Sequence, residues 1–319
     1  MKLFLRKTFL FLSIPMAVFI LGLFLPATPK ARQSLLMSKF TKDSLLDNVA
    51  KPRIIFIAGS SMSLGLNSQI FVDSLHMNPI NTGIHGGLGA FYMMDDAADR
   101  IKAGDIVVMA PEYHQFYGNF AYGGEELLRA AFDTSSPRLL LNLRWEQFKK
   151  MYGFVPKYSI SKFLPNQYFA LTKNDFYSKD AFNKYGDAVL HYGKTFEHEI
   201  PIFKNIDGGE FNKELIAAIS EFNKIVKAKG ATFYLSYPPF QRASYDNCLK
   251  QIKEVDKALH TIPNLTILGT PERYAMDQNL IFDTPYHLNK VGVDLRSTRL
   301  YEDVKKQMQK DGLLKTQAQ

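Results

Sequence analysis

Apolar and polar positions alternate along most of this chain in a way that predicts strands followed by helices. Short runs of β-branched and apolar residues, each closed by glycine, proline or a polar turn, predict five buried strands of a parallel sheet, over residues 53–58, 79–82, 106–110, 232–236 and 265–268. Apolar residues at helical spacing predict helices over residues 67–75, 88–103, 211–229 and 291–308. Strands that alternate with helices are typical of an α/β fold with a doubly wound parallel sheet flanked by helices.

A long uncharged segment precedes this pattern. The chain carries no charge from Thr8 to Leu25, which is long enough to cross a hydrocarbon layer of roughly 30 Å as a helix. A cleaved signal peptide is the alternative, because a basic start precedes the run and small residues at 27–31 follow it. The run is longer than a usual signal sequence, which favours an uncleaved single-pass anchor over residues 1–29. The basic start favours an N-terminus inside and a domain outside the cytoplasm, in the periplasm or at the cell surface.

The remaining chain divides by composition. Residues 30–51 are mixed and polar enough to predict a stalk, and residues 52–319 form the domain. Residues 111–210 interrupt the alternation of strands and helices and are too long for a plain loop. We expect a mostly helical insertion there, packed over the edge of the sheet where a site would lie.

Composition excludes several classes of function. Lys and Arg outnumber Asp and Glu by 39 to 31, giving a net charge of +8, which favours an acidic partner such as anionic lipid or an anionic wall polymer. No basic block concentrates that charge, so nucleic acid is not an expected partner. Cys248 is the only cysteine, which excludes an intramolecular disulfide and a thiolate metal cluster. The spacing of His191 and His198 fits no usual ligand motif, and we expect no metal.

Two separate segments carry residues suited to nucleophilic chemistry. Residues 59–65, which contain Ser60 and Ser61, lie directly after the first predicted strand and before a helix. A serine at such a turn is held near backbone N–H groups that stabilise a developing oxyanion, although serines also cap helices. Asp283 and His287 lie in a loop before the final helix. A carboxylate there can orient the imidazole, which then takes the proton from a serine.

The serine segment resembles a known family. Residues 57–65 resemble the first block of SGNH (GDSL-like) hydrolases, with Ser60 where the family usually has Asp and Ser61 at the nucleophile. Residues 81–87 are similar to the second block, whose glycine, here Gly86, donates its N–H to the oxyanion together with the N–H of the nucleophile. The resemblance implies a flavodoxin-like order of the parallel five-stranded sheet.

The last block resembles the family with two departures. Asp283 and His287 match its acid and base, but three residues separate them where the family has two. The third block also lacks its asparagine, because Glu112, Tyr113 and His114 follow the third strand. The absence of one oxyanion donor typically costs about 100-fold to 1000-fold in rate. Either another group, such as Tyr113 or His114, substitutes for it, or the activity is slow or specialised. Glu112, Tyr113 and His114 are candidates to line the site, and simple packing is the alternative for all three.

An N-terminal anchor joined to a divergent SGNH domain resembles the D-alanine transfer protein of teichoic-acid modification and the alginate O-acetylation proteins. That resemblance implies an acyltransferase or acylesterase that modifies a cell-envelope glycan or polymer through an acyl-serine on Ser61, without a cofactor. It implies a membrane-bound O-acyltransferase as a partner, besides the lipid around the anchor. The alternatives are a catalytically inactive glycan-binding or assembly component and an envelope lipase.

Overall fold

The core of the protein is a five-stranded parallel sheet in the order β2-β1-β3-β4-β6. The computed structural model describes residues 1–134, 140, 142–169, 176–196, 198–206 and 208–314. The strands are β1 (Arg53–Ile57), β2 (Asn78–Asn81), β3 (Ile106–Met109), β4 (Thr232–Leu235) and β6 (Thr266–Ile267). All five lie at positions predicted from the apolar runs. A small parallel pair, β5 (Phe240–Gln241) and β7 (Ala275–Met276), lies outside the sheet.

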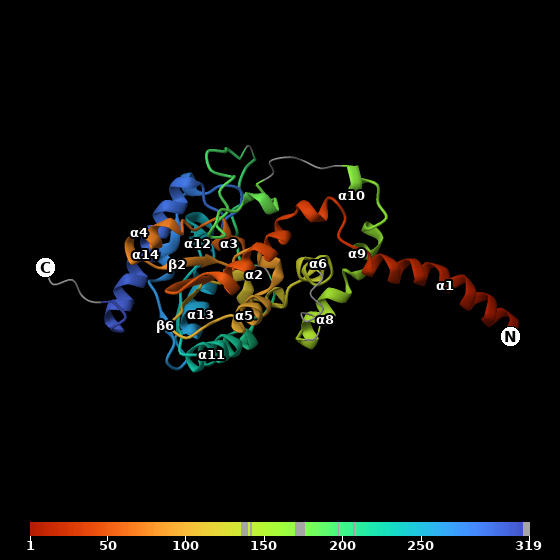
Figure 1. Ribbon diagram of the computed structural model, residues 1–319, viewed down its shortest axis with the longest axis horizontal. Helices are drawn as coiled ribbons and strands as arrows, with labels where there is room; N and C mark the ends of the chain where they lie inside the picture. The colour runs from red at the N-terminus through yellow and green to blue at the C-terminus, as the bar shows by residue number, and fades with distance from the viewer. Residues whose placement is uncertain (135–139, 141, 170–175, 197, 207, 315–319) are drawn as a thin grey trace.

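Helices cover the sheet because its central strands are apolar on both faces. Every residue of β1 and β3 is buried, as expected of strands enclosed between two layers of helices. In Figure 1, α4 (Gln69–Leu75) and α14 (Lys290–Lys310) lie above the sheet, and α5 (Ala90–Ala98) and α11 (Lys213–Ala228) lie below it. These four helices were predicted. Helices α12 (Arg242–Asn247) and α13 (Leu249–Leu259) were not.

The N-terminal helix α1 (Lys2–Phe24) stands apart from the domain. Its 23 residues form one helix that is long and apolar enough to cross a membrane. It projects from one side of the body, and the C-terminal end of α14 lies at the opposite side (Figure 1). Gly22, near the end of the helix, is its only buried residue.

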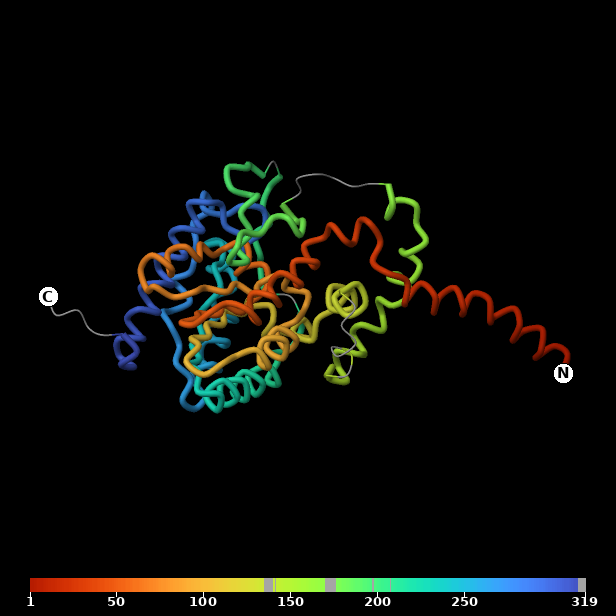
Figure 2. Tube along the Cα trace, in the orientation of Figure 1, coloured from red at the N-terminus to blue at the C-terminus, as the bar shows by residue number. Residues whose placement is uncertain are grey.

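The segment expected to be a stalk is packed against the domain. Residues 30–51 form the short turns η1 (Ala31–Gln33) and η2 (Leu35–Met37) and the helix α2 (Ser38–Asn48), which run along the body in Figure 2. Leu46 is buried in the main core. Lys42 donates hydrogen bonds of 2.8 Å to the carbonyl of Asn81 and 2.6 Å to that of Gly186. This segment is part of the fold because its apolar side chains are buried and the ammonium group of Lys42 is hydrogen-bonded to backbone carbonyls.

The parts of the insertion have different positions. Its helices are α6 (Glu125–Asp133), α8 (Trp145–Tyr152), α9 (Val155–Ser161) and α10 (Asn166–Phe169). Helix α9 packs against α1, and α6 packs against the turn that follows β2, but none of the four helices lines the cavity at the edge of the sheet. Residues 176–210 contain one short turn, η6 (Lys179–Ala181), and are otherwise irregular where described. The expectation of a mostly helical cover over the site is therefore wrong in its placement. The irregular part contributes Tyr177 and Phe203 to the site, and the first residues of the insertion contribute Glu112, His114 and Phe120.

Candidate functional site

A cavity of about 440 Å³ lies beyond the carboxyl ends of β1, β2 and β3. Ligand sites of parallel α/β sheets are found at this edge. Ser60, His85, Gly86, Glu112, His114 and His287 are among its lining residues. The cavity thus brings together all of the separate segments that sequence analysis singled out.

The serine turn is built around a close approach of two loops. Gly59 precedes the short helix α3 (Ser60–Ser63). A Cβ atom at Gly59 would lie 2.6 Å from the Cα of Gly86 and 2.5 Å from Oε1 of Glu112. Any side chain at this position would therefore push the loops after β2 and β3 away from the serines. This packing is the physical reason for a glycine at the end of β1.

Ser60 and Ser61 occupy different positions. Ser60 lines the cavity, whereas Ser61 is buried and its Oγ makes no hydrogen bond within the described part of the chain. The backbone N–H of Ser61 donates a 3.1 Å hydrogen bond to Oε1 of Glu112. In this structure, therefore, Ser61 is not hydrogen-bonded to His287, and one expected oxyanion donor is already bound to a carboxylate.

Asp283 and His287 form the expected pair in spite of their longer spacing. The distance from Nδ1 of His287 to Oδ1 of Asp283 is 2.8 Å. A tight turn permits it, because the N–H of His287 donates to the carbonyl of Thr284 at 3.1 Å and the N–H of Phe282 donates to the carbonyl of His287 at 2.8 Å. The extra residue is thus accommodated within the turn, and the His287 ring is held through Nδ1.

Tyr177 is a third member of this group that sequence analysis missed. Its hydroxyl donates to Oδ2 of Asp283 and lies 3.2 Å from Nδ1 of His287. Burial acts to raise the pKa of Asp283, but the hydrogen bonds from His287 and Tyr177 outweigh it and hold this pKa below its ordinary value. Asp283 is therefore ionised at neutral pH and suited to stabilise a protonated His287. Nothing in the sequence distinguishes Tyr177 from the other tyrosines of the insertion.

The second block forms a turn around Gly86. Nδ1 of His85 accepts a 3.0 Å hydrogen bond from the N–H of Gly87. Gln115 fixes the same turn, since its amide donates to the carbonyl of Gly86 at 2.9 Å and accepts from the N–H of Ala90 at 3.0 Å. Gln115, which sequence analysis also missed, thus positions the proposed oxyanion glycine without reaching the cavity itself.

The residues after β3 divide into two that line the cavity and one that does not. Glu112 and His114 are lining residues. Tyr113 is buried with its ring 5.5 Å from that of Phe240, edge to face. Oε2 of Glu112 is buried without a hydrogen-bond partner in the described residues. The expectation that Tyr113 lines the site is therefore wrong, because its ring is part of the packing, whereas Glu112 and His114 face the cavity.

Two of the histidines that line the cavity, His85 and His114, are neutral at neutral pH. Burial lowers the pKa of His114 to about 4 against an opposing effect of Glu112, and burial lowers the pKa of His85 against opposing effects of Glu126 and Glu112. His191 is buried and lies outside the cavity. Its Nε2 is 3.1 Å from the carbonyl oxygen of Leu288, and burial lowers its pKa to about 4. Within the described residues, no group of three or more His, Cys, Asp or Glu is arranged to hold a metal ion.

Comparisons with known proteins add no family to this geometry. No protein-family model matches the chain, and no curated protein matches it. The functional argument therefore depends on the site.

Proposed function

We propose that this chain is a membrane-anchored SGNH-type enzyme that transfers or hydrolyses an acyl group on a cell-envelope glycan or polymer. The observation that carries the proposal is the Asp283–His287–Tyr177 group, beside a cavity that also receives the serine turn and the Gly86 turn. The sheet has the strand order of flavodoxin-like proteins, whose ligand sites lie at this edge.

Each residue has a role in the proposed reaction. Oγ of Ser61 attacks the acyl carbonyl while Nε2 of His287 takes its proton, and Asp283 stabilises the resulting imidazolium. The proton then passes to the leaving oxygen, whose bond to the acyl carbon breaks, and an acyl-serine remains. A hydroxyl of the glycan, or water, attacks that ester in the same way and regenerates Ser61. The N–H groups of Gly86 and Ser61 are the proposed oxyanion donors, the second after Glu112 has released it.

Labelling with a fluorophosphonate probe tests this proposal on the full-length chain in detergent or membranes. We expect labelling that is lost in Ser61→Ala and greatly reduced in His287→Ala. Ser60→Ala is the matched control, because this neighbouring serine lines the same cavity. Labelling that survives Ser61→Ala and disappears in Ser60→Ala would move the nucleophile by one residue. Short acyl-sugar esters and long-chain esters, compared as substrates, distinguish a glycan enzyme from a lipase.

A second candidate function is a non-catalytic glycan-binding or assembly component. Two observations favour this function. The Glu112 carboxylate accepts a hydrogen bond from the N–H of Ser61, and the Ser61 hydroxyl has no hydrogen-bond partner among the described residues. A correctly folded chain that no serine probe labels would support this function over the first. A membrane-bound O-acyltransferase is the proposed partner in either case, and only the resemblance supports it.

The proposed location is a single-pass membrane protein with an inside N-terminus and an extracytoplasmic domain. Contacts of the last turns of α1 with the domain favour an uncleaved anchor: the hydroxyl of Ser159 donates to the carbonyl of Phe19, and Gly22 packs against Ser159. Cleavage near residues 27–31 would remove the Gly22 contact. A membrane-impermeant maleimide should label an exposed Lys306→Cys in intact cells, while wild type, with its buried Cys248, stays unlabelled. Labelling of Lys306→Cys only after lysis would contradict this orientation.

A further inference from the structure

The helical part of the insertion carries an unusual amount of exposed apolar surface. Eight of its large apolar or aromatic side chains between residues 145 and 169 are exposed, among them Trp145 at 72%, Tyr152 at 79% and Phe169 at 85%. An apolar hollow of about 520 Å³ lies between α6 and α8, lined by Trp145 and Tyr152 among others. Exposed apolar surface on this scale marks a contact with a partner or a membrane.

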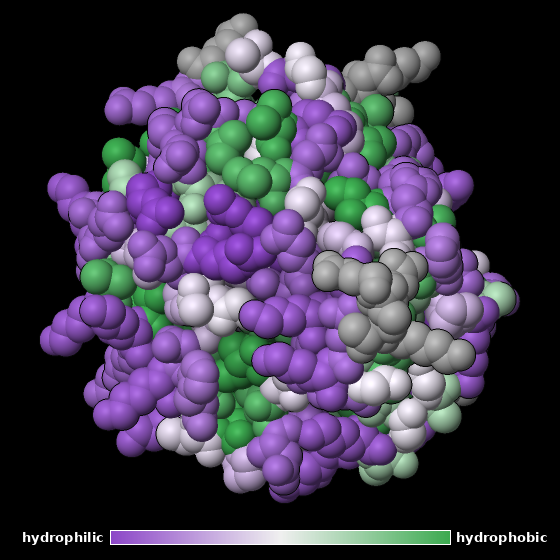
Figure 3. Space-filling model, turned by 90° about the vertical axis from the view of Figure 1, so that its left-hand side faces the viewer, coloured by the Kyte–Doolittle hydropathy of each residue, from purple (hydrophilic) through white to green (hydrophobic). Residues whose placement is uncertain are grey.

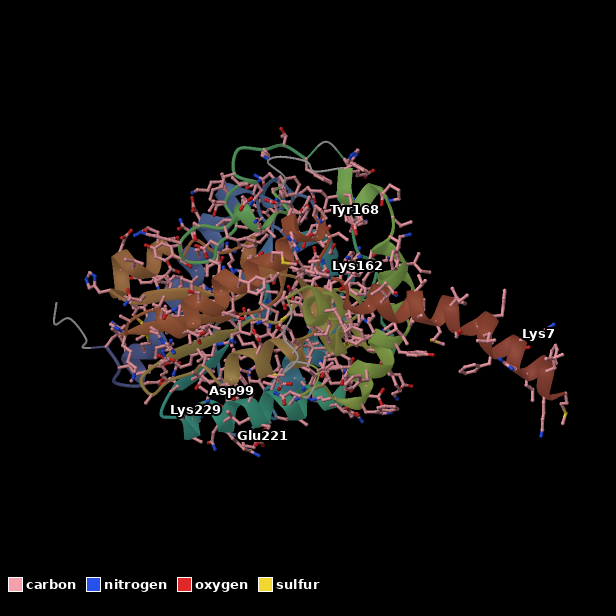
Figure 4. The ribbon with its side chains drawn as sticks, turned by 45° about the vertical axis from the view of Figure 1, so that its right-hand side comes forward. Lys7, Asp99, Lys162, Tyr168, Glu221 and Lys229 are labelled. Atoms are coloured by element: carbon pink, nitrogen blue, oxygen red, sulfur yellow. The ribbon has the colours of Figure 1, made fainter. Side chains whose placement is uncertain are left out.

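This surface is fixed to the end of α1. Ser159 of α9 donates from its hydroxyl to the carbonyl of Phe19, and a Cβ at Gly22 would lie 2.8 Å from the ring of Phe163. Phe24 and Phe132 of α6 are in edge contact with their ring centroids 5.8 Å apart. Figure 4 shows Lys162 and Tyr168 near the base of α1 and Lys7 toward its free end.

The depth of these contacts follows from helix geometry. The uncharged run of α1 ends at about Leu25, and each helical residue rises about 1.5 Å. If α1 spans the bilayer, Phe19 and Gly22 lie roughly 5 to 9 Å inside the outer edge of the hydrocarbon layer. Interfacial amphipathic helices are buried to about 5–10 Å, and α9 touches α1 at this depth.

We propose that residues 145–169, here called the interfacial platform, lie in the outer membrane–water interface and bind lipid directly. The inference rests on the anchor proposed above. Its chemistry fits lipid: Trp and Tyr are enriched at this level of a bilayer. The platform carries four lysines and one glutamate. Lys149 and Lys157 are exposed, and each forms a salt bridge, with Glu146 and Glu125 respectively. The excess of lysine over glutamate in the platform favours anionic headgroups.

The opposite side of the protein provides the contrast. Figure 3 views the molecule from the side away from α1, and that face is mostly hydrophilic with scattered apolar patches. The platform is therefore a directional feature that faces the membrane from which α1 emerges. Its function is to hold the body against the bilayer and so set the height of the catalytic cavity above it.

Trp145 makes this proposal directly measurable, because it is the only tryptophan of the chain. The full-length protein is placed in nanodiscs of phosphatidylcholine and phosphatidylglycerol that contain nitroxide lipids, labelled at the headgroup, high on the acyl chain or near its end. Trp145 emission is expected to fall most with the shallow acyl-chain label and to change little with aqueous iodide. The matched control carries Trp145→Phe with Lys306→Trp, which moves the tryptophan to the exposed surface of α14 at the opposite side of the body. Lipid quenching of the native tryptophan should exceed that of the control several-fold, and iodide quenching should show the reverse order.

Each other outcome overturns the proposal. Quenching of Trp145 by iodide at the level of the control, without lipid quenching, would mean that the platform lies in water. Protection from both quenchers would mean that another protein, such as a second copy or a membrane enzyme, covers it. An alkaline carbonate wash separates failure of the anchor from failure of the platform. A chain released by the wash refutes both, and a retained chain with a water-exposed Trp145 refutes the platform alone.

Discussion

Glu112 provides the sharpest test of how this site works. Its carboxylate accepts the N–H of Ser61 at 3.1 Å, where an oxyanion would have to bind. The substitution Glu112→Gln keeps the shape of the side chain and removes its charge. If the carboxylate opposes the developing oxyanion, the variant should react with serine probes faster than the wild-type chain.

The magnitude follows from the positions of the two oxygens. If Glu112 stayed at the N–H of Ser61 while the oxyanion bound there, the two oxygens would lie about 4 Å apart, where two like charges at an effective dielectric constant of about 20 repel by about 4 kcal/mol. Both histidines near Glu112 are neutral at neutral pH because burial lowers their pKa values, so they do not cancel its charge. A change of about 4 kcal/mol corresponds to roughly a 1000-fold increase in rate as an upper limit.

The assay is the rate of fluorophosphonate labelling of the full-length chain under pseudo-first-order conditions. Glu126→Gln is the matched control, since this carboxylate lies near Gly87 and not at the N–H of Ser61. A double variant with Ser61→Ala shows whether any new labelling is on the proposed nucleophile. An unchanged or slower rate in Glu112→Gln would refute the idea that the Glu112 carboxylate opposes the oxyanion. It would mean that Glu112 moves away from the N–H of Ser61 without slowing the reaction, or that Glu112 itself assists the reaction.

Three further predictions concern residues around the site. Tyr177→Phe removes a hydrogen bond to an ionised Asp283, which is worth about 1.5–3 kcal/mol. The variant should therefore have a kcat/KM for an acyl ester that is lower by about 10-fold to 100-fold. An unchanged kcat/KM would show that Tyr177 does not orient Asp283 and His287. Gly59→Ala should leave a folded chain with little serine labelling, because its Cβ meets Gly86 at 2.6 Å; normal labelling would contradict the close approach of the two loops. His191 remains neutral in the folded chain, with its pKa lowered by burial from 6.5 to about 4, whereas the unfolded chain takes up a proton below about pH 6.5. The free energy of unfolding should therefore fall as the pH falls from 6.5 to 4, by at most ~3 kcal/mol for this residue. In urea unfolding, His191→Gln should lose less of this free energy over the same pH range than the wild-type chain. An equal loss would exclude His191 as the cause.

The sequence predicted the sheet well because its strands are buried on both faces. Continuous apolar runs such as β1 and β3 leave little ambiguity. The segment before the domain was misjudged for the opposite reason. Lys39 and Lys42 suggest a solvated stalk, but Lys39 binds Asp43 and Asp96, and Lys42 is buried against two carbonyl groups. Composition cannot show that a distant part of the chain satisfies a buried lysine.

The site was predicted in its local parts and missed in its long-range ones. Asp283 and His287 were found because they lie in one loop, four positions apart. Tyr177 lies more than a hundred residues away in sequence from both of them. The sequence drew attention to Glu112 because the segment after β3 lacks the expected asparagine. The hydrogen bond between Glu112 and Ser61, however, depends on how the loops after β1, β2 and β3 pack together. Such a contact follows from topology and register, which short motifs do not specify.

The position of Tyr177 also links the site to the segment that follows α1. The N–H of Leu35 donates to the carbonyl of Tyr177 at 3.0 Å, and Ser34 pairs with Ser178 as an antiparallel bridge. Leu35 itself lines the cavity, only eleven residues after the end of α1 at Phe24. The segment that leaves the proposed anchor therefore holds the tyrosine that orients Asp283 and His287. The Asp283–His287–Tyr177 group and the segment that follows α1 are thus parts of one structural unit.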